Sequence, residues 1–334
     1  MKIVYVGPYS GEEEIVQKAF LEHEVLFIEK LEHLQPPDFN SAEVISVFVD
    51  TPVTSDVIEK MPSLKHIAAR STGFDHIDLE AAKANDVVIS RVPHYGAETV
   101  AEYAIAMMFT LSRNVYRAYM DIQDSTTVPS LEPYEGFTLS GKTIGVVGTG
   151  TIGKNVCQIA RGIGMRVLAY EVHPDEDWAA SYEVTYMPLD ELLRDSDIVS
   201  IHVPALPATE HMIGKEEIAL MKKSAYLINT ARGSIVDTAS LVVALRDKAI
   251  AGAALDVLEG EPEMHDELEL LNQKNVNPEI WQLLAANHAL IDLSNVIVTP
   301  HIAFNTKEAK REITDTTLEN IINWSKGGHF NQVS

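Results

Sequence analysis

Three side chains in the second half of the sequence could do acid–base chemistry on an anionic substrate: Arg232, Glu261 and His301. Each follows a short apolar run that is typical of a buried strand, and open α/β sheets bind ligands beyond the carboxyl ends of their strands. A guanidinium can hold a carboxylate, a histidine can pass a proton to a carbonyl oxygen, and a carboxylate beside it favours the charged imidazole. The set therefore predicts a site for a small oxo or hydroxy acid.

Each of these residues also has a purely structural interpretation. Arg232 could form a surface ion pair, and His301 could be a satisfied core histidine. Glu261 lies among other acids, of which Glu259 is the alternative partner for the imidazole. The context Asn-Thr-Ala-Arg-Gly and the Glu-Pro step favour the catalytic interpretation.

A glycine-rich segment, Gly148–Gly153, has the spacing G-x-G-x-x-G. The spacing alone also fits an ordinary strand–helix turn, but here an apolar run precedes it and a helical pattern follows it. In such a unit Gly148 permits the tight turn, Gly150 lets the backbone approach a pyrophosphate, and Gly153 lets helix and strand pack closely. The free N–H groups at the helix start bind phosphate. The segment therefore predicts a dinucleotide site.

The next predicted strand ends in an acid, Glu171, 18 residues past Gly153. A carboxylate there accepts hydrogen bonds from the adenine ribose hydroxyls and repels a 2′-phosphate. Like charges ~4 Å apart cost about 4 kcal/mol at an effective dielectric near 20, or roughly a thousandfold in affinity. Because residues 172–175 include no Arg or Lys, we predict NAD rather than NADP as the cofactor.

Two successive sets of strand signals alternate with helical stretches, which predicts an α/β fold with two doubly wound parallel sheets. Between them, Glu98–Leu111 is predicted as a helix with almost no polar face, which must be buried between domains or subunits. An amphipathic helix over Lys307–Trp324 is expected to pack on the first domain, and the acidic stretch Glu259–Asn287 is interpreted as an insertion. The predicted strands are Lys2–Gly7, Glu24–Ile28, Glu43–Asp50, His66–Ala69, Val87–Arg91, Thr143–Gly148, Arg166–Glu171, Ile198–His202, Ala225–Asn229, Gly252–Asp256 and Val296–Thr299.

Charge and composition exclude several classes of partner. The chain of 334 residues carries a formal net charge of −23, which repels nucleic acid and anionic membrane surfaces. The single cysteine, Cys157, excludes an internal disulfide framework, and the longest apolar run, Tyr103–Leu111, is about half of what spans a bilayer. Histidines such as His202 and His211 lack metal-ligand spacing, so we assign them structural roles and expect no metal. We predict a soluble cytoplasmic protein with a small-molecule substrate.

The motifs around Arg232, Glu261 and His301, in this order after the glycine-rich segment, resemble those of the D-isomer-specific 2-hydroxyacid dehydrogenases. The resemblance extends over nearly the whole chain and includes Arg70–Asp78. It implies that Arg232 binds the substrate carboxylate, that His301 is the general acid/base, and that Glu261 hydrogen-bonds the imidazole.

The same resemblance implies further ligand contacts. The substrate would be bound by Thr72, Gly73, Tyr95, Arg232, His301 and Phe304. The cofactor NAD would be bound by Gly148, Gly150, Thr151, Ile152, Gly153, Glu171, Val203, Pro204, Thr209, Thr230, Ala231, Asp256 and His301. Thr151 stands where an arginine is common, which would weaken one phosphate contact.

The family fold implies an NAD-binding Rossmann domain at residues 100–301, inserted into a flavodoxin-like substrate-binding domain. That second domain would comprise residues 1–99 and 302–334. The resemblance also implies a homodimer, formed through the cofactor domain around Glu98–Leu111.

Within the family, interconversion of pyruvate and D-lactate is the leading case, because Val92–Gly96 and Phe304 resemble D-lactate dehydrogenases. The alternatives are phosphoglycerate dehydrogenase and glyoxylate/hydroxypyruvate reductase, for which Arg70 and Arg91 are candidate phosphate-binding cations. A different class is an NAD-sensing corepressor or scaffold, since the same fold can serve without turnover.

Overall fold

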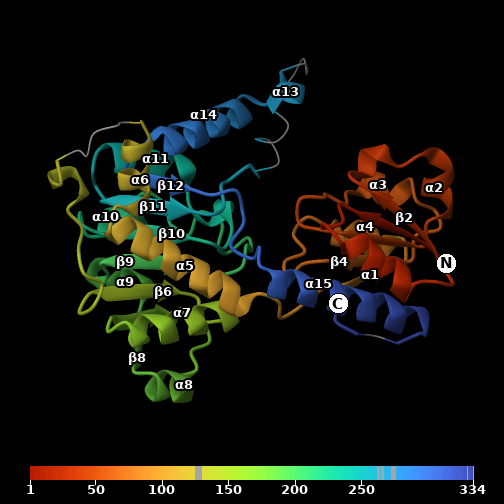
Figure 1. Cartoon of the computed structure of the whole chain (residues 1–334), viewed down its shortest axis with the longest axis horizontal. Coiled ribbons are helices and arrows are strands. Elements are labelled where there is room, and N and C mark those ends of the chain that lie inside the picture. Colours follow the sequence, from red (N-terminus) through yellow and green to blue (C-terminus); the bar gives the residue numbers. More distant parts are fainter. Residues whose placement is uncertain (125–129, 262–263, 265–266, 272–275, 329, 334) are drawn as a thin grey trace. The chain divides into compact units, whose positions relative to one another are not determined.

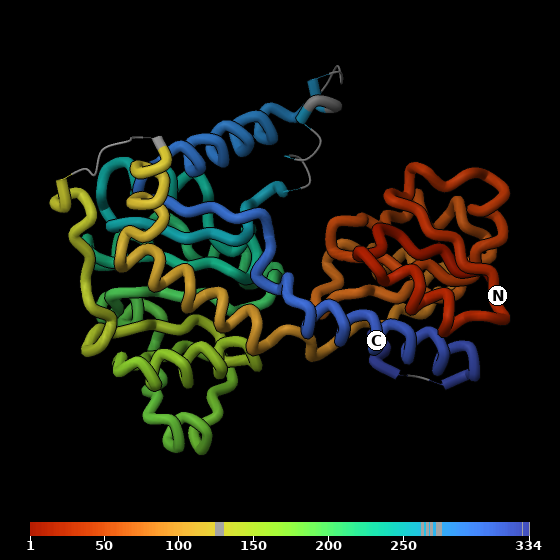
Figure 2. The backbone as a smooth tube through the Cα atoms, in the orientation of Figure 1, coloured from red at the N-terminus to blue at the C-terminus, as the bar shows by residue number. Residues whose placement is uncertain are grey.

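The computed structural model describes residues 1–334 except 125–129, 262–263, 265–266, 272–275, 329 and 334. The chain forms two compact units: unit 1 is Met1–Gly96 with Asn305–Ser334, and unit 2 is Ala97–Phe304. The backbone therefore runs through most of unit 1, completes unit 2 and returns to unit 1 (Figure 2). The expected division has the same order, with crossings after residues 99 and 301 in place of 96 and 304.

Unit 2 is built on a parallel sheet in the order β12-β11-β10-β9-β6-β7-β8 (Figure 1). This order reverses between β6 and β9, the switch point where doubly wound sheets bind dinucleotides. The glycine-rich turn that follows β6 therefore starts at the switch point. The strands are β6 (Thr143–Val147), β7 (Arg166–Tyr170), β8 (Val184–Tyr186), β9 (Ile198–Ile201), β10 (Tyr226–Asn229), β11 (Gly252–Leu255) and β12 (Val296–Val298).

Helices cover both faces of this sheet and bury two apolar clusters (Figure 1). On one face Ala104 and Met108 of α5 pack with Val156 of α7, so one side of the nearly all-apolar helix predicted there is buried inside unit 2, whereas Phe109 is exposed. On the other face α9, α10, α11 and α14 supply Leu192, Ile218, Leu241 and Leu290. The helices are α5 (Ala97–Ser112), α6 (Val115–Asp124), α7 (Thr151–Gly162), α8 (Glu176–Ser181), α9 (Leu189–Asp195), α10 (Lys215–Leu220), α11 (Thr238–Arg246), α13 (Glu267–Leu270) and α14 (Pro278–Asp292), with short 3₁₀ turns at Glu132–Tyr134 and Gly233–Ile235.

Unit 1 has a sheet in the order β13-β5-β4-β3-β1-β2, which is the flavodoxin-like order with one added antiparallel edge strand. Its C-terminal helix α15 packs on this sheet beside α1, as the sequence predicts, and buries Leu318 and Ile321 against Ile3. The elements are β1 (Lys2–Val6), α1 (Glu12–Ala19), β2 (Glu24–Ile28), a 3₁₀ turn at Leu31–His33, α2 (Pro36–Ser41), β3 (Val44–Val47), α3 (Ser55–Glu59), β4 (His66–Ala69), α4 (Leu79–Ala84), β5 (Val88–Ser90), α15 (Lys307–Ser325) and β13 (Gln332–Val333).

A buried ion pair links four elements of unit 1: β1, α1, β4 and α15. Arg70, which is fully buried after β4, pairs with Glu12 of α1 at 3.1 Å. The Thr314 hydroxyl of α15 donates to the same carboxylate at 2.7 Å, and so does the Tyr5 hydroxyl at 2.6 Å. Because Arg70 is fully buried and paired, it is not a surface cation ready for a phosphate.

The structure adds elements that the sequence did not predict. Strands β8 and β13 are only three and two residues long, which is too short for a hydrophobic pattern to identify a strand. The stretch interpreted as an insertion contains the start of the 15-residue helix α14, which begins with Pro278 after the Asn277 cap and runs on to Asp292. In the described part of the chain, no helix is long and apolar enough to cross a membrane.

Candidate active site

His301 and Glu261 form a direct pair in unit 2. The Nδ1 atom of His301 lies 2.9 Å from Oε2 of Glu261, and the other carboxylate oxygen accepts the Leu258 N–H at 2.8 Å. The carboxylate is therefore oriented from behind, and with Nδ1 donating to it, the Nε2 atom is left to face a substrate. Both side chains are partly exposed, at 28% and 30%, so a ligand can reach them.

The turn that carries His301 is held by Asp256, at the end of β11. Its carboxylate accepts hydrogen bonds from the Thr299 hydroxyl at 2.6 Å and from the N–H groups of Ile302 and Ala303 at 3.0 and 2.8 Å. Burial raises the pKa of Asp256 by more than these hydrogen bonds lower it. In the structure, Asp256 stabilises the turn that carries His301. Its contact with the cofactor stays a prediction.

Arg232 lies in a turn after β10 that is fixed by the buried Asn229. The Asn229 side chain donates to the Arg232 carbonyl at 2.8 Å and accepts the Ala231 N–H at 3.0 Å. A Cβ atom on Gly233 would lie 2.1 Å from the Leu258 carbonyl oxygen. Only glycine fits there, and this close approach joins the Arg232 turn to the segment that leads to Glu261.

Glu259, the alternative partner for His301, is engaged elsewhere. Its Oε1 atom lies 2.7 Å from Nε2 of His211, and its carbonyl accepts the Asn287 side chain at 2.8 Å. The hydrogen bond from Glu259 raises the pKa of His211. His211 thus has a structural contact, as predicted, and it holds the loop next to Glu261.

The glycine-rich turn has the geometry expected of a dinucleotide site. Gly148 has φ of +94°, and a Cβ there would lie 2.8–2.9 Å from atoms of His202 and Val203 at the start of the loop after β9. A Cβ on Gly153 would lie 1.9 Å from the Gly148 carbonyl oxygen, so helix α7 needs glycine at this crossing. The loop after β9 is closed by the Thr209 hydroxyl, 2.6 Å from the Pro204 carbonyl oxygen.

Glu171 is held by backbone groups at the end of β7. Its Oε2 accepts the Thr149 N–H at 2.8 Å, and its Oε1 accepts the Val172 N–H at 2.8 Å and the His173 N–H at 3.5 Å. Partial burial alone would raise the pKa of Glu171, but these hydrogen bonds outweigh it and lower the pKa. The carboxylate is therefore ionised and fixed, as recognition of ribose hydroxyls requires.

The predicted cofactor residues after β10 fit such a ligand. The Thr230 hydroxyl is buried and has no hydrogen-bond partner among the residues that the structure describes. A buried polar atom of this kind is normally satisfied, so a bound polar group beside Thr230–Ala231 would complete it. Thr151 and Ile152 form the first turn of α7, whose free N–H groups suit a pyrophosphate.

The predicted substrate residues are divided between the units. Thr72, Gly73 and Tyr95 lie in unit 1, whereas Phe304 lies in unit 2 with Arg232 and His301. The Thr72 loop follows β4 and is fixed by its own contacts: the Thr72 hydroxyl donates to Val92 O at 2.8 Å, and the Ser71 hydroxyl donates to Gly73 O at 2.6 Å. The Arg91 side chain donates to Thr72 O at 3.2 Å.

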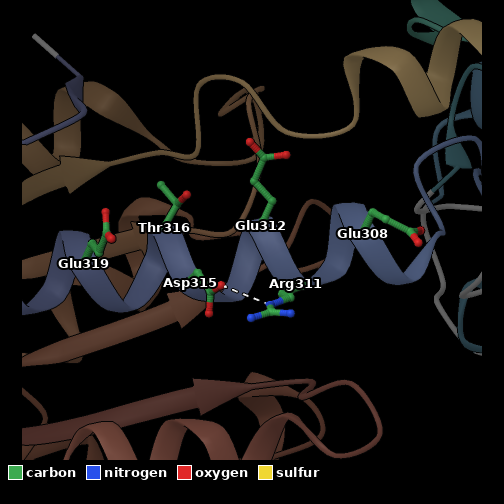
Figure 3. Close-up of a pocket in the computed structure, with 6 residues that line it drawn as sticks. All are labelled: Glu308, Arg311, Glu312, Asp315, Thr316 and Glu319. Atoms are coloured by element: carbon green, nitrogen blue, oxygen red, sulfur yellow. Dashed lines mark ion pairs between the residues drawn. The ribbon is translucent and has the colours of Figure 1, made fainter.

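A surface hollow along α15 is not a second site of this kind. All its lining side chains come from one helix, and its one ion pair joins Arg311 to Asp315 at 3.5 Å (Figure 3). Such a set of exposed acids is an ordinary solvated helix face. The lining residues are Glu308, Arg311, Glu312, Asp315, Thr316 and Glu319.

Sequence reasoning missed two contributors to the cofactor edge. Tyr186, on the short strand β8, places its hydroxyl 2.8 Å from the Thr149 hydroxyl, and Lys154 pairs with Asp175 at 2.5 Å. The lack of Arg or Lys in residues 172–175 was therefore not enough to predict the charge near a 2′-phosphate, because Lys154 of α7 pairs with Asp175 of this segment. In the described residues, no group of three or more His, Cys, Asp or Glu could hold a metal ion.

The doubly wound sheet, the glycine turn at its switch point and the His–Glu pair define an NAD-binding dehydrogenase. Residues 105–303 match the family described as D-isomer specific 2-hydroxyacid dehydrogenase, NAD binding domain. The chain belongs to the D-isomer-specific 2-hydroxyacid dehydrogenases. It is an NAD-dependent oxidoreductase that interconverts 2-oxo acids and D-2-hydroxy acids.

Individual relatives support this assignment. The chain is 37% identical to D-lactate dehydrogenase of Escherichia coli K12, over 86% of this chain and 85% of that one. It is 34% identical to glyoxylate reductase of Korarchaeum cryptofilum, over 85% and 80%. A D-lactate dehydrogenase from Aquifex aeolicus, solved with NAD and lactic acid, superposes with a TM-score of 0.86 at 34% identity, covering 97% and 96% of the two chains.

Proposed function

We propose that the substrate is a small 2-oxo acid, with pyruvate and D-lactate as the leading pair. The observation that carries the reaction is the 2.9 Å contact between His301 Nδ1 and Glu261 Oε2, on the same unit as Arg232. The observation that favours pyruvate is the similarity to D-lactate dehydrogenases over most of the chain.

In this proposal each of the three side chains has one task. Arg232 binds the substrate carboxylate with its guanidinium fork. In the direction of reduction, His301 donates the proton on Nε2 to the carbonyl oxygen; in oxidation the neutral imidazole takes the hydroxyl proton. Glu261 fixes the ring and stabilises the imidazolium. Bound NADH supplies the hydride to C2, and bound NAD⁺ accepts it in reverse.

The residues proposed to hold the cofactor follow the switch-point strands of unit 2. Glu171 would bind the adenine ribose, and the N–H groups of the first turn of α7 would bind the pyrophosphate. The nicotinamide side would be formed by Val203, Pro204, Thr209, Thr230, Ala231 and Asp256.

Selection of the substrate is proposed to rest on Tyr95 and Phe304. A ring beside the C3 position removes water from a methyl group at little cost but leaves a phosphate without its hydration. Arg70 is buried in its pair with Glu12, and Arg91 is bonded to the Thr72 carbonyl oxygen, so neither favours a phosphorylated substrate. Glyoxylate remains an alternative, since one related enzyme is a glyoxylate reductase.

The test is kcat/KM with NADH for pyruvate, 2-oxobutyrate, glyoxylate, hydroxypyruvate and phosphohydroxypyruvate, with chiral analysis of the product. We expect pyruvate to be favoured and the product to be D-lactate. A preference for glyoxylate or the phosphorylated acid would contradict the proposed substrate. An L-product would contradict the assignment of D-stereospecificity. Tight NADH binding without any turnover would favour the sensor or scaffold class.

We also propose a cytoplasmic homodimer. The interface was expected around Glu98–Leu111, but one face of that helix packs on α7 within unit 2. The neighbouring helix α6 leaves apolar side chains exposed, which a second copy would cover. Light scattering should give the mass of a dimer, and Tyr119→Lys should give a monomer; a monomeric unmodified protein would contradict the proposal. The exposed side chains of α6 are Val115, Tyr116, Tyr119, Met120 and Ile122, and Phe109 of α5 is exposed as well.

A further inference from the structure

Lys154 pairs with Asp175, which lies in the turn that follows Glu171. The Lys154 Nζ atom lies 2.5 Å from Oδ2 of Asp175 and 5.0 Å from the centre of the Trp178 ring. Lys154 is on the first turns of α7, immediately after the glycine-rich turn, and Asp175 lies four residues past Glu171. Hydrogen bonds to Lys154 and to the Trp178 N–H lower the pKa of Asp175, so it is charged at neutral pH.

A tyrosine hydroxyl connects this ion pair to Glu171. The Tyr186 hydroxyl lies 3.4 Å from the Asp175 N–H nitrogen and 2.8 Å from the Thr149 hydroxyl. Thr149 in turn bonds Glu171 through its N–H at 2.8 Å. Asp175, Tyr186, Thr149 and Glu171 therefore form one continuous polar chain at the edge where the adenine ribose is proposed to bind.

A 2′-phosphate at this edge would be stabilised by a lysine that could turn toward it. The Lys154 side chain has four flexible carbons and is 30% exposed, so its position depends on its partner. With Asp175 present, the ammonium is neutralised and held against Trp178. Without that carboxylate, the same ammonium would be available to an anion.

We propose that Asp175 is a second specificity-determining residue for NAD over NADP, because it sequesters Lys154 from the position of a 2′-phosphate. The proposal rests on the proposed cofactor site at Glu171. It assigns the preference to two acids with different actions: Glu171 repels the phosphate directly, whereas Asp175 withholds a cation.

The test is equilibrium binding of NADH and NADPH to the intact protein, followed by cofactor fluorescence. Asp175→Ser removes the charge but keeps a side chain able to cap α8, which Asp175 caps through the Trp178 N–H at 3.1 Å. We expect NADPH to bind about threefold to tenfold more tightly. An unpaired ammonium near a phosphate at a protein surface increases the affinity by roughly that factor. NADH affinity should change little. Asp175→Asn, which also caps helices, is a second variant in case Ser disturbs the loop.

Two further variants separate the roles of the two charges. Lys154→Met in the Asp175→Ser background should abolish the gain in NADPH affinity. Asp177→Ser removes an exposed acid two residues away and should leave both affinities unchanged. A gain that survives Lys154→Met would overturn the proposal, since the removed negative charge alone would explain it.

Unchanged NADPH affinity in both Asp175 variants would also overturn it. These outcomes differ from failure of the proposed cofactor site, which would show as equal NADH and NADPH affinity in the unmodified protein. Measurement of binding rather than turnover keeps the result independent of the substrate.

Discussion

The backbone N–H of His301 donates a hydrogen bond to the carbonyl oxygen of Asp256 over 2.8 Å. His301 has φ of +53°, a left-handed conformation that non-glycine residues rarely adopt. The strain is maintained because the Asp256 carboxylate also holds the next two N–H groups. The direction of the imidazole is therefore set by β11 as well as by its own strand β12.

Asp256→Asn should destabilise the protein and slow turnover. An amide cannot accept all the hydrogen bonds that the two carboxylate oxygens accept, and an unsatisfied buried group costs about 1–3 kcal/mol. The free energy of unfolding, measured with urea, and kcat should both decrease. Asp247→Asn, at an exposed position, is the control; equal effects of the two substitutions would contradict the role of Asp256.

Glu261→Gln should shift the pH profile for reduction of the 2-oxo acid toward lower pH. The amide can still accept a hydrogen bond from Nδ1 but no longer stabilises the imidazolium by charge. The profile of kcat/KM against pH for both directions is the measurement. Glu259→Gln should leave the profile in place because Glu259 bonds His211, and the reverse pattern would reassign the partner.

Glu171→Ala should narrow the difference in affinity between NADH and NADPH. Repulsion of the 2′-phosphate, about 4 kcal/mol at ~4 Å for an effective dielectric near 20, is lost with the carboxylate. Fluorescence titration gives both dissociation constants. Glu176→Ala, an exposed acid on α8, should leave their ratio unchanged; a ratio that is equally insensitive to Glu171 would remove this residue from the site.

Acid should weaken both units through two histidines, the fully buried His66 and the half-buried His202. Burial lowers the pKa of His66 and of His202 to about 3, against 6.5 for a free imidazole. Between these pH values the unfolded chain binds more protons than the folded one. The contribution of the two neutral histidines to the free energy of unfolding is therefore fully present above pH 6.5 and decreases as the pH falls toward 3. At pH 5 each histidine lowers the free energy of unfolding by about 2 kcal/mol relative to neutral pH.

The measurement is chemical unfolding at pH 7.5 and pH 5. His66→Phe should reduce the loss for unit 1, since it keeps a ring against Trp324 at the cost of the Ser90 hydrogen bond. A loss at pH 5 that is identical with and without His66 would exclude this explanation.

Much of the fold could be predicted because buried parallel strands have a strong local signal. Strands β2 and β4 were predicted to the residue, and helices α5 and α15 to within one residue at each end. Strand β8 was not predicted, because its three residues, Val184–Tyr186, are too few to show a clear hydrophobic pattern. The edge strand β13 pairs antiparallel with β5, and such pairing depends on where the chain returns rather than on its own residues.

The candidate site shows the same division. The motifs around Arg232, Glu261 and His301 could be recognised from types and order, and the structure brings Glu261 to His301 across 40 positions in sequence. Contacts that choose one acid over another could not be recognised. The Glu-Pro step favoured Glu261 over Glu259, but nothing in the sequence indicated that His211 would bind Glu259.

The division of unit 1 between the two ends of the chain sets an order on its folding at the ribosome. Unit 2 is complete once Phe304 has emerged, but residues 305–334 must follow before α15 can cover Ile3, Val44 and Ala68. At ~5–20 residues per second this takes about 2–6 s. For that time the nascent chain carries a finished unit 2 beside an uncovered apolar sheet face, and that face is where a chaperone would bind.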